Sequence, residues 1–476
     1  MRFCFFIVFT LFLVLPQNAS AGKLSADIDK ALTEPCLNPE QTAVRIVEIK
    51  SGKVVYDKNG DEAMTPASIM KVLTTATSLS VLGPNYRFKT DFLVTGKITG
   101  GVVNGDLVIR GGGDPDLTPE EVWKISEELA RMGIKEITGN LVLDNTFFDD
   151  MSKAPSWNGT RTQNPYDAKL SALSVNFNTV AVHVYPGITA GEPLRVSLEP
   201  GSGYFTIANK SKTIARGKRK ILVKRVKRNG GYVMVVNGTM RRSDHETVIY
   251  VNINEPLIFA GKVFKFQFAK SGIKILGNIK KGKATDKLKV LVTHKSKPLS
   301  VILRGLNRYS NNFVAEQIIK TMDAEMHGKP GTHKTGLEIT RQFLSNAKVN
   351  LANVTLADGS GLSRKNRLTA HTLTDLLVAV NHNFKIWPDF VSALGIMGVD
   401  GSVRNRLAGS QATGMARAKT GTLSRISTLT GYVATKKTGK LYGYAIFLNN
   451  MSCYYKQADK IEDKIVTAIH MNGDTE

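Results

Sequence analysis

Ser68 and Lys71 are the first residues whose types and spacing suggest chemistry. A serine hydroxyl becomes nucleophilic only beside a base, and a lysine can be that base when its surroundings lower its pKa. The segment is typical of a helix that begins near Thr65 and ends at Gly83. Residues three apart share a helical face, so the Lys71 amine can reach the Ser68 hydroxyl. Alone, the pattern is weak, because both residue types are common.

Two further motifs follow in the same chain. Ser310-Asn311-Asn312 precedes a predicted helix, and Lys419-Thr420-Gly421-Thr422 precedes a predicted strand. Either motif alone is typical of an ordinary helix cap or strand-end turn. With Ser-x-x-Lys in front, they form the ordered set that class A β-lactamases and penicillin-binding proteins share, with Asn311 where that set has Asp. The three motifs together predict a serine acyl-enzyme.

The first two motifs supply the acid–base chemistry. Ser68 is the candidate nucleophile and Lys71 the acceptor of its proton. Ser310 can relay a proton toward the leaving amine, and Asn312 can hold Lys71 or the substrate amide. The start of the Ser68 helix adds free N–H groups and positive potential, which favour an oxyanion.

The third motif is suited to binding a substrate. Lys419 and Thr420 offer a cation and a hydroxyl to a terminal carboxylate. Gly421 allows the backbone to approach closely. The N–H groups of Thr422 and Ser68 would then form the oxyanion hole.

Elements with α/β character lie at both ends of the chain. Residues 41–56 predict a β-hairpin, and residues 299–343 are mainly helical. Near the C-terminus, strands are predicted at Ile426–Val433 and Leu441–Asn449. An amphipathic helix follows them, with Ile461 and Ile465 on one face.

A β-rich middle separates these ends. From Phe88 to about Val290, short alternating segments and Gly/Asn turns predict strands, interrupted by one helix at Pro119–Met132. We expect one discontinuous domain that carries a long insertion. The expected parts are a catalytic domain (22–88 and 288–476), an inserted domain (89–192 and 243–287) and a small basic β-rich domain (193–242).

With these motifs, the chain resembles the class C low-molecular-mass penicillin-binding proteins, the penicillin-binding protein 4 type. Further shared segments are Leu82-Gly83-Pro84, Gly111-Gly112-Gly113-Asp114-Pro115, Gly139-Asn140-Leu141, Asp358-Gly359-Ser360-Gly361-Leu362-Ser363-Arg364 and Asp400-Gly401-Ser402. The resemblance implies an α/β (α+β) fold, with a serine β-lactamase/transpeptidase-like domain whose antiparallel sheet is flanked by helices. It also implies a serine-type D-Ala-D-Ala carboxypeptidase or endopeptidase that remodels peptidoglycan. Its expected partners are peptidoglycan peptides and β-lactam antibiotics, and no metal or organic cofactor is needed.

The resemblance extends to individual residues. Arg364 would contact substrate carboxylates, unless it only shapes its loop. Family members place an acidic residue for the substrate amine where this chain has Arg161, with Asp167 close by. A diaminopimelate-type preference is therefore not implied. The first and last strands of such a domain are antiparallel neighbours, which implies a disulfide between Cys36 and Cys453; two unpaired thiols are the alternative.

Other functions have to be weighed against this one. A serine β-lactamase uses the same serine and lysine, but it has no use for so long an insertion, and no Glu could be assigned as a deacylation base. A His-dependent hydrolase is disfavoured, because no histidine adjoins the motifs. A non-catalytic wall-binding protein would not need three intact motifs.

The N-terminus predicts export. Arg2 is followed by a 13-residue apolar run and by Ala19-Ser20-Ala21, typical of a signal peptide (residues 1–21) cleaved before Gly22. A membrane anchor is the alternative, although the run is too short to span a bilayer. We therefore expect a periplasmic or cell-envelope protein.

The charge is strongly basic, with 64 Lys and Arg against 40 Asp and Glu among 476 residues. Ten of the nineteen residues from Lys210 to Arg228 are basic. For an exported protein we expect no nucleic acid partner, but an anionic wall polymer or membrane surface. A solvated basic face is the alternative.

Overall fold

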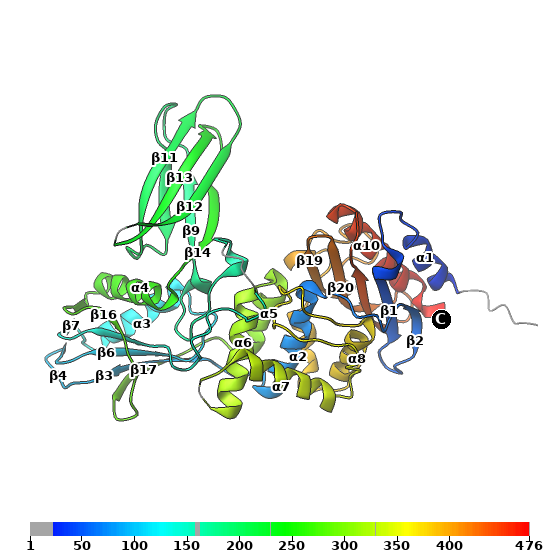
Figure 1. Cartoon of the computed structure of the whole chain (residues 1–476), viewed down its shortest axis with the longest axis horizontal. Helices are drawn as coiled ribbons and strands as arrows, with labels where there is room; N and C mark the ends of the chain where they lie inside the picture. Colours follow the sequence, from blue (N-terminus) through cyan, green and yellow to red (C-terminus); the bar gives the residue numbers. More distant parts are fainter. Residues whose placement is uncertain (1–21, 158–161, 229, 329, 476) are drawn as a thin grey trace, which may run out of the picture.

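The computed structural model describes residues 22–157, 162–228, 230–328 and 330–475. The predicted signal peptide (1–21) and Arg161 lie outside the described residues. The molecule is elongated: one large sheet with its helices forms one end, and several smaller sheets form the other (Figure 1). Among the described helices, none combines the length and the apolar character that a membrane span needs.

The large sheet has six strands, all antiparallel, in the order β18-β19-β20-β21-β1-β2. The strands are β1 (Thr42–Glu48), β2 (Val54–Lys58), β18 (Gly395–Ile396), β19 (Ala416–Leu423), β20 (Ile426–Ala434) and β21 (Leu441–Leu448). Nearly every residue of β20 and β21 is buried, because helices cover both faces of the sheet. The first and last strands of the chain, β1 and β21, are antiparallel neighbours, as predicted.

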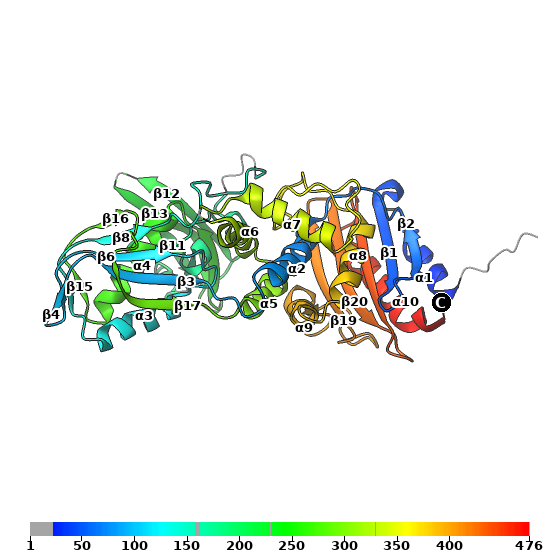
Figure 2. The ribbon, with the colours of Figure 1, turned by 90° about the horizontal axis from the view of Figure 1, so that it is seen from below.

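Two helix layers enclose this sheet (Figure 2). One face packs against the terminal helices α1 (Lys23–Ala31) and α10 (Tyr455–Asn472), which share a core with it. The other face shares its core with α2 (Lys71–Val81), α5 (Leu299–Tyr309), α6 (Asn312–His327), α7 (His333–Asn346), α8 (Ala370–Asn381) and α9 (Trp387–Ala393). The predicted antiparallel sheet flanked by helices is therefore confirmed.

The middle of the chain folds into four smaller sheets. A five-stranded sheet has the order β16-β8-β6-β3-β17, and a four-stranded sheet has the order β15-β7-β5-β4. Two three-stranded sheets have the orders β10-β9-β14 and β11-β13-β12. The strands are β3 (Lys89–Val94), β4 (Ile98–Thr99), β5 (Val102–Val103), β6 (Leu107–Gly111), β7 (Glu136–Ile137), β8 (Leu141–Asp144), β9 (Thr179–Tyr185), β10 (Arg195–Glu199), β11 (Phe205–Ile214), β12 (Lys220–Arg228), β13 (Gly231–Arg241), β14 (Thr247–Asn252), β15 (Lys274–Ile275), β16 (Ile279–Lys281) and β17 (Lys289–Lys295).

Helices also belong to this region. α3 (Pro119–Arg131) is the predicted helix, but α4 (Pro256–Lys270) is a second one, so the expectation of a single helix was wrong. α4 buries Phe259, Phe264 and Phe268 in the core of the region. β3 and β17 pair with each other, so the region begins and ends in adjacent strands. The exact domain limits stay a prediction.

A disulfide links Cys36 to Cys453, as predicted, with the two Cα atoms 4.9 Å apart. Cys36 lies shortly before β1, and Cys453 lies between β21 and α10. The bond therefore joins the two chain ends beside the pair of strands that brings them together.

Candidate active site

Ser68 lies in a short 3-10 turn, η2 (Ala67–Met70), that leads directly into α2. Thr65, near which the helix was predicted to begin, does not cap it, since its hydroxyl accepts from the Arg367 guanidinium. Ser68 is partly exposed, whereas Lys71 is fully buried one turn later. The Lys71 Nζ lies 3.0 Å from the Ser68 Oγ, as the spacing predicted.

Two further groups hold the Lys71 amine. Its Nζ donates to Asn312 Oδ1 at 2.7 Å and to the Ser360 carbonyl at 2.6 Å. Burial lowers the pKa of Lys71 to about 7, although the charges of Asp358 and Glu316 act in the opposite direction. A neutral amine that keeps both of these donor bonds has its lone pair free to accept a proton from Ser68.

The second motif lies where one helix ends and the next begins. Ser310 follows α5 in a left-handed conformation, with φ of 55°. Asn311 is the N-cap of α6, because its side chain accepts from the Val314 N–H. Asn312 is the first residue of α6, and its amide bridges Lys71 and the Tyr166 carbonyl. Asn311 therefore caps the helix, while Asn312 contacts the Lys71 amine.

The third motif lies inside strand β19, not ahead of a strand as predicted. Lys419 is fully buried, and its Nζ donates to Ser310 Oγ at 3.0 Å and to the Thr420 carbonyl at 2.6 Å. Burial, and then the nearby charge of Lys71, hold the pKa of Lys419 well below its usual value. The three motifs therefore meet in one place.

Gly421 brings β19 against the serine turn. A Cβ at this position would lie 2.8 Å from both the Ser68 N and the Pro66 carbonyl oxygen, and 2.3 Å from the Thr428 hydroxyl. Only glycine allows this approach. The next residue, Thr422, is exposed, and the Thr420 hydroxyl lies 2.9 Å from that of Ser402.

A loop that starts at Asp358 packs beside Lys71 and holds one of its hydrogen-bond acceptors in place. Glu316, on α6, accepts from the N–H groups of Gly359 and Ser360, which fixes the Ser360 carbonyl that binds Lys71. Asp358 accepts from four groups, including the Trp157 indole N–H. The sequence predicted a shaped loop here, but it gave no sign of Glu316 or Trp157.

Arg364 lies at the outer end of the same loop. It is exposed, and its guanidinium donates to the Ser424 carbonyl at 2.7 Å, just beyond β19. Asp167, in contrast, is 1% exposed and forms an ion pair with Lys153. Its carboxylate is therefore not a free receptor for a substrate amine.

A cavity of about 700 Å³ opens beside Ser310 and Asn312. Its lining joins the catalytic end of the molecule to the inserted region: Pro165, Tyr166, Asn176, Phe177, Thr179, Tyr250, Tyr309, Ser310, Asn311, Asn312 and Phe313. None of these side chains is charged. Tyr166, Tyr250 and Tyr309 are each about half exposed or more.

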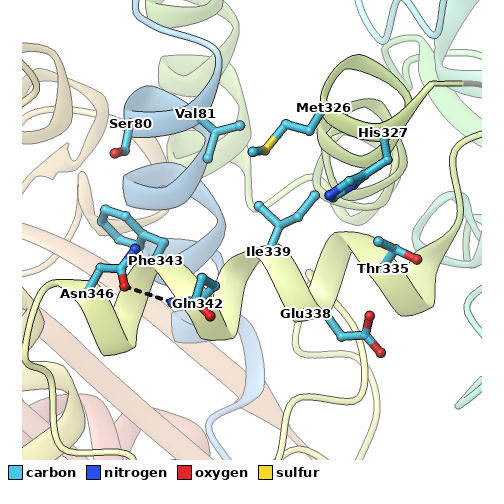
Figure 3. Close-up of a pocket in the computed structure, with 10 residues that line it drawn as sticks. All are labelled: Ser80, Val81, Met326, His327, Thr335, Glu338, Ile339, Gln342, Phe343 and Asn346. Atoms are coloured by element: carbon cyan, nitrogen blue, oxygen red, sulfur yellow. Dashed lines mark hydrogen bonds between the residues drawn. The ribbon is translucent and has the colours of Figure 1, made fainter.

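Figure 3 shows a second cavity, of about 380 Å³, among the C-terminal end of α2, the end of α6 and helix α7. Its lining holds Ser80 and Val81, a full helix length from Lys71, and no residue of the three motifs. Gln342 and Asn346 bond to each other on its wall. This cavity is not the candidate active site.

Comparisons with known proteins agree with this geometry. The sequence pattern of the D-Ala-D-Ala carboxypeptidase 3 (S13) family matches residues 24–470. A D-alanyl-D-alanine carboxypeptidase from Actinomadura sp. (strain R39) is 33% identical over 433 residues, which cover 88% of this chain and 79% of that protein. The D-alanyl-D-alanine carboxypeptidase DacB of Haemophilus influenzae is 25% identical over 425 residues, 87% of each chain. The crystal structure of penicillin binding protein 4 from Haemophilus influenzae shares the fold, with a TM-score of 0.78, 23% identity, and coverage of 94% of this chain and 99% of that one.

Proposed function

Because the chain belongs to the D-Ala-D-Ala carboxypeptidase 3 (S13) family, we propose that it hydrolyses D-alanyl-D-alanine-type bonds of peptidoglycan peptides through an acyl-enzyme on Ser68. The chain is a serine hydrolase of the carboxypeptidase/endopeptidase kind. One observation carries the assignment of the site. The Lys71 amine bonds to Ser68 and to Asn312, and Lys419 bonds to Ser310, so the three motifs meet in one place.

Acylation begins with neutral Lys71. Its Nζ takes the Ser68 proton while the Ser68 Oγ attacks the carbonyl carbon of the penultimate D-Ala. Asn312 and the Ser360 carbonyl keep the Nζ in place during this transfer. The Ser68 N–H and the Thr422 N–H stabilise the oxyanion, since Gly421 lets β19 lie against the serine turn.

Departure of the terminal residue requires a proton and a grip on its carboxylate. Ser310 bonds to Lys419, so it can pass a proton toward the leaving nitrogen. Lys419 and Thr420 bind the terminal carboxylate, whose negative charge favours the protonated form of Lys419 against the effect of burial, and Arg364 is a further cation at the edge of the site. Lys71 is neutral again once its proton has passed through Ser310 to the leaving nitrogen. It then takes a proton from the water that attacks the acyl carbon and gives that proton to the Ser68 Oγ as the acyl group departs.

The substrate peptide lies along the 700 Å³ cavity beside Ser310. This lining offers phenol rings and amides but no carboxylate, and Asp167 is occupied by Lys153. We therefore propose that a charged amine on the substrate side chain contributes little to recognition. β-Lactams acylate the same serine because they mimic the D-Ala-D-Ala amide.

Digestion of defined muropeptides tests this function. Pentapeptide monomers and cross-linked dimers would be incubated with the protein, and the products read by mass spectrometry. Loss of one D-Ala, or cleavage of the cross-link, is the expected result. Intact muropeptides combined with rapid turnover of penicillin would instead indicate a β-lactamase.

We further propose that residues 1–21 direct export and that the Lys210–Arg228 segment binds an anionic wall polymer or membrane surface. The leader pattern and the Cys36–Cys453 disulfide support export, since disulfides persist in oxidising compartments. N-terminal sequencing of the protein from its host should begin at Gly22. A sequence that begins at Met1 would contradict cleavage.

A further inference from the structure

The sheet β11-β13-β12 has one face whose side chains are exposed or half-buried among the described residues. Its inner face contributes Tyr232, Met234 and Val236 to the core. The register of the three strands places the alternate residues together on the other side, which we call the outer face. Its members are Thr206, Ala208, Lys210, Lys212, Ile214, Lys220, Leu222, Lys224, Val226, Arg228, Gly231, Val233, Val235, Asn237, Thr239 and Arg241.

Six residues of the outer face are basic and exposed: Lys210, Lys212, Lys220, Lys224, Arg228 and Arg241. Arg241 pairs with Asp244, and the other five have no ion-pair partner in the described part of the chain. The sequence from Pro200 to Ser243 contains no Asp or Glu at all. The positive charge of this face is therefore available to an external anion.

The same face also carries apolar side chains on β12 and β13. Leu222 is 47% exposed between Lys220 and Lys224 on its own strand. Val233 and Val235 on the central strand β13, and Val226 opposite Val233 on β12, are half-buried and belong to no core cluster among the described residues. A polyanion in water attracts the lysines but gains nothing from the apolar side chains. An exposed leucine and half-buried valines interleaved with Lys and Arg match an anionic bilayer surface, which binds both kinds of side chain.

We infer that the outer face binds the surface of an anionic lipid bilayer, with Leu222 at the acyl boundary and the basic residues on the headgroups. The sheet projects from the body of the molecule (Figure 1), so a flat surface can meet it. This deepens the proposed envelope location by naming the partner. It does not depend on the chemistry of Ser68.

Vesicle sedimentation tests the inference on residues 22–476, the span that contains every described residue. The protein should bind vesicles of phosphatidylglycerol and phosphatidylcholine, but not phosphatidylcholine alone, and binding should weaken with salt. The triple variant Lys220→Glu, Lys224→Glu, Arg228→Glu should lose about a hundredfold or more in partitioning.

Matched controls separate the face from net charge. The triple variant Lys437→Glu, Lys440→Glu, Lys456→Glu changes the same charge at exposed positions near β20, β21 and α10, and it should bind like the wild type within about threefold. Leu222→Ser should weaken vesicle binding about fivefold while leaving binding to soluble polyphosphate unchanged.

Three results would overturn the inference: equal losses in both triple variants, no effect of Leu222→Ser, or binding to polyphosphate or sacculi without binding to vesicles. The last would assign the face to a wall polymer.

Penicillin acylation is measured on the same samples. Normal acylation with lost vesicle binding shows that a variant is folded. Failed acylation in the wild type would count against Ser68 as the nucleophile and not against the binding face.

Discussion

Lysine has opposite environments in two regions of this molecule. In the candidate active site, Lys71 and Lys419 are fully buried, and burial is the main cause that lowers their pKa values. On the outer face, Lys220 and Lys224 are exposed and form no ion pair among the described residues. Removal from water disfavours the charged form of an amine, so burial can turn a lysine into a base at neutral pH. The comparison teaches that the fold, and not the residue type, decides whether a lysine does chemistry or only carries charge.

The largest effect is expected from Lys71→Ala. Loss of the proton acceptor should lower the rate of acylation by penicillin about a thousandfold. Lys224→Ala, the matched variant in the exposed region, should acylate at the wild-type rate. Stopped-flow measurement with a fluorescent penicillin gives both rates, and Lys71→Met with an unchanged melting temperature controls for misfolding. Similar rates in Lys71→Ala and Lys224→Ala would break the comparison.

A smaller loss is expected from Lys419→Ala. A charged hydrogen bond to a substrate carboxylate contributes about 2 kcal/mol, which corresponds to roughly a thirtyfold decrease in kcat/KM for a D-Ala-D-Ala peptide. A peptide analogue whose terminal carboxylate is amidated should lose far less on the same substitution. If both peptides lost activity equally, Lys419 would be supporting the structure and not binding the carboxylate.

The pH dependence sharpens the buried side of the comparison. Because Lys71 has a pKa lowered to about 7 and must be neutral to accept the proton, acylation should rise with pH and level off above 8. At pH 6 the rate should be about a tenth of the plateau. A pH–rate profile for acylation measures this midpoint. A rate that falls between pH 6 and pH 8 would contradict neutral Lys71 as the base.

The smallest effect on chemistry is expected from removal of the disulfide. It spans 417 residues and joins only the ends of the six-stranded region. The double variant Cys36→Ser, Cys453→Ser gains entropy in its unfolded state, so its free energy of unfolding should fall by up to about 5 kcal/mol. Its rate of acylation at 25 °C should stay near that of the wild type. Urea unfolding gives the first quantity. Two reactive thiols in the denatured, unreduced protein would exclude the bond.

Local signals in the sequence predicted much of the site. Each motif is short, and the helix that carries Lys71 and the strand pair β20 and β21 have clear patterns. The sequence could not predict Glu316, because its partners are backbone N–H groups more than forty residues away. It also missed helix α4, in which Gly261 and several aromatic residues weaken the helical signal.

The basic segment shows the same limit. The density of Lys and Arg between Lys210 and Arg228 is plain in the sequence. Which of them share a face follows only from the pairing of β11 and β12 with β13. Arg225, for example, lies on the inner side, where its guanidinium donates to Asn252.

The central claim is that Ser68 forms the acyl-enzyme, and intact-protein mass spectrometry after exposure to penicillin tests it most directly. The account predicts one stable adduct per chain, located on the peptide that contains Ser68, and none in a folded Ser68→Ala variant. An adduct that persists in Ser68→Ala, or one that maps to another residue, would contradict it.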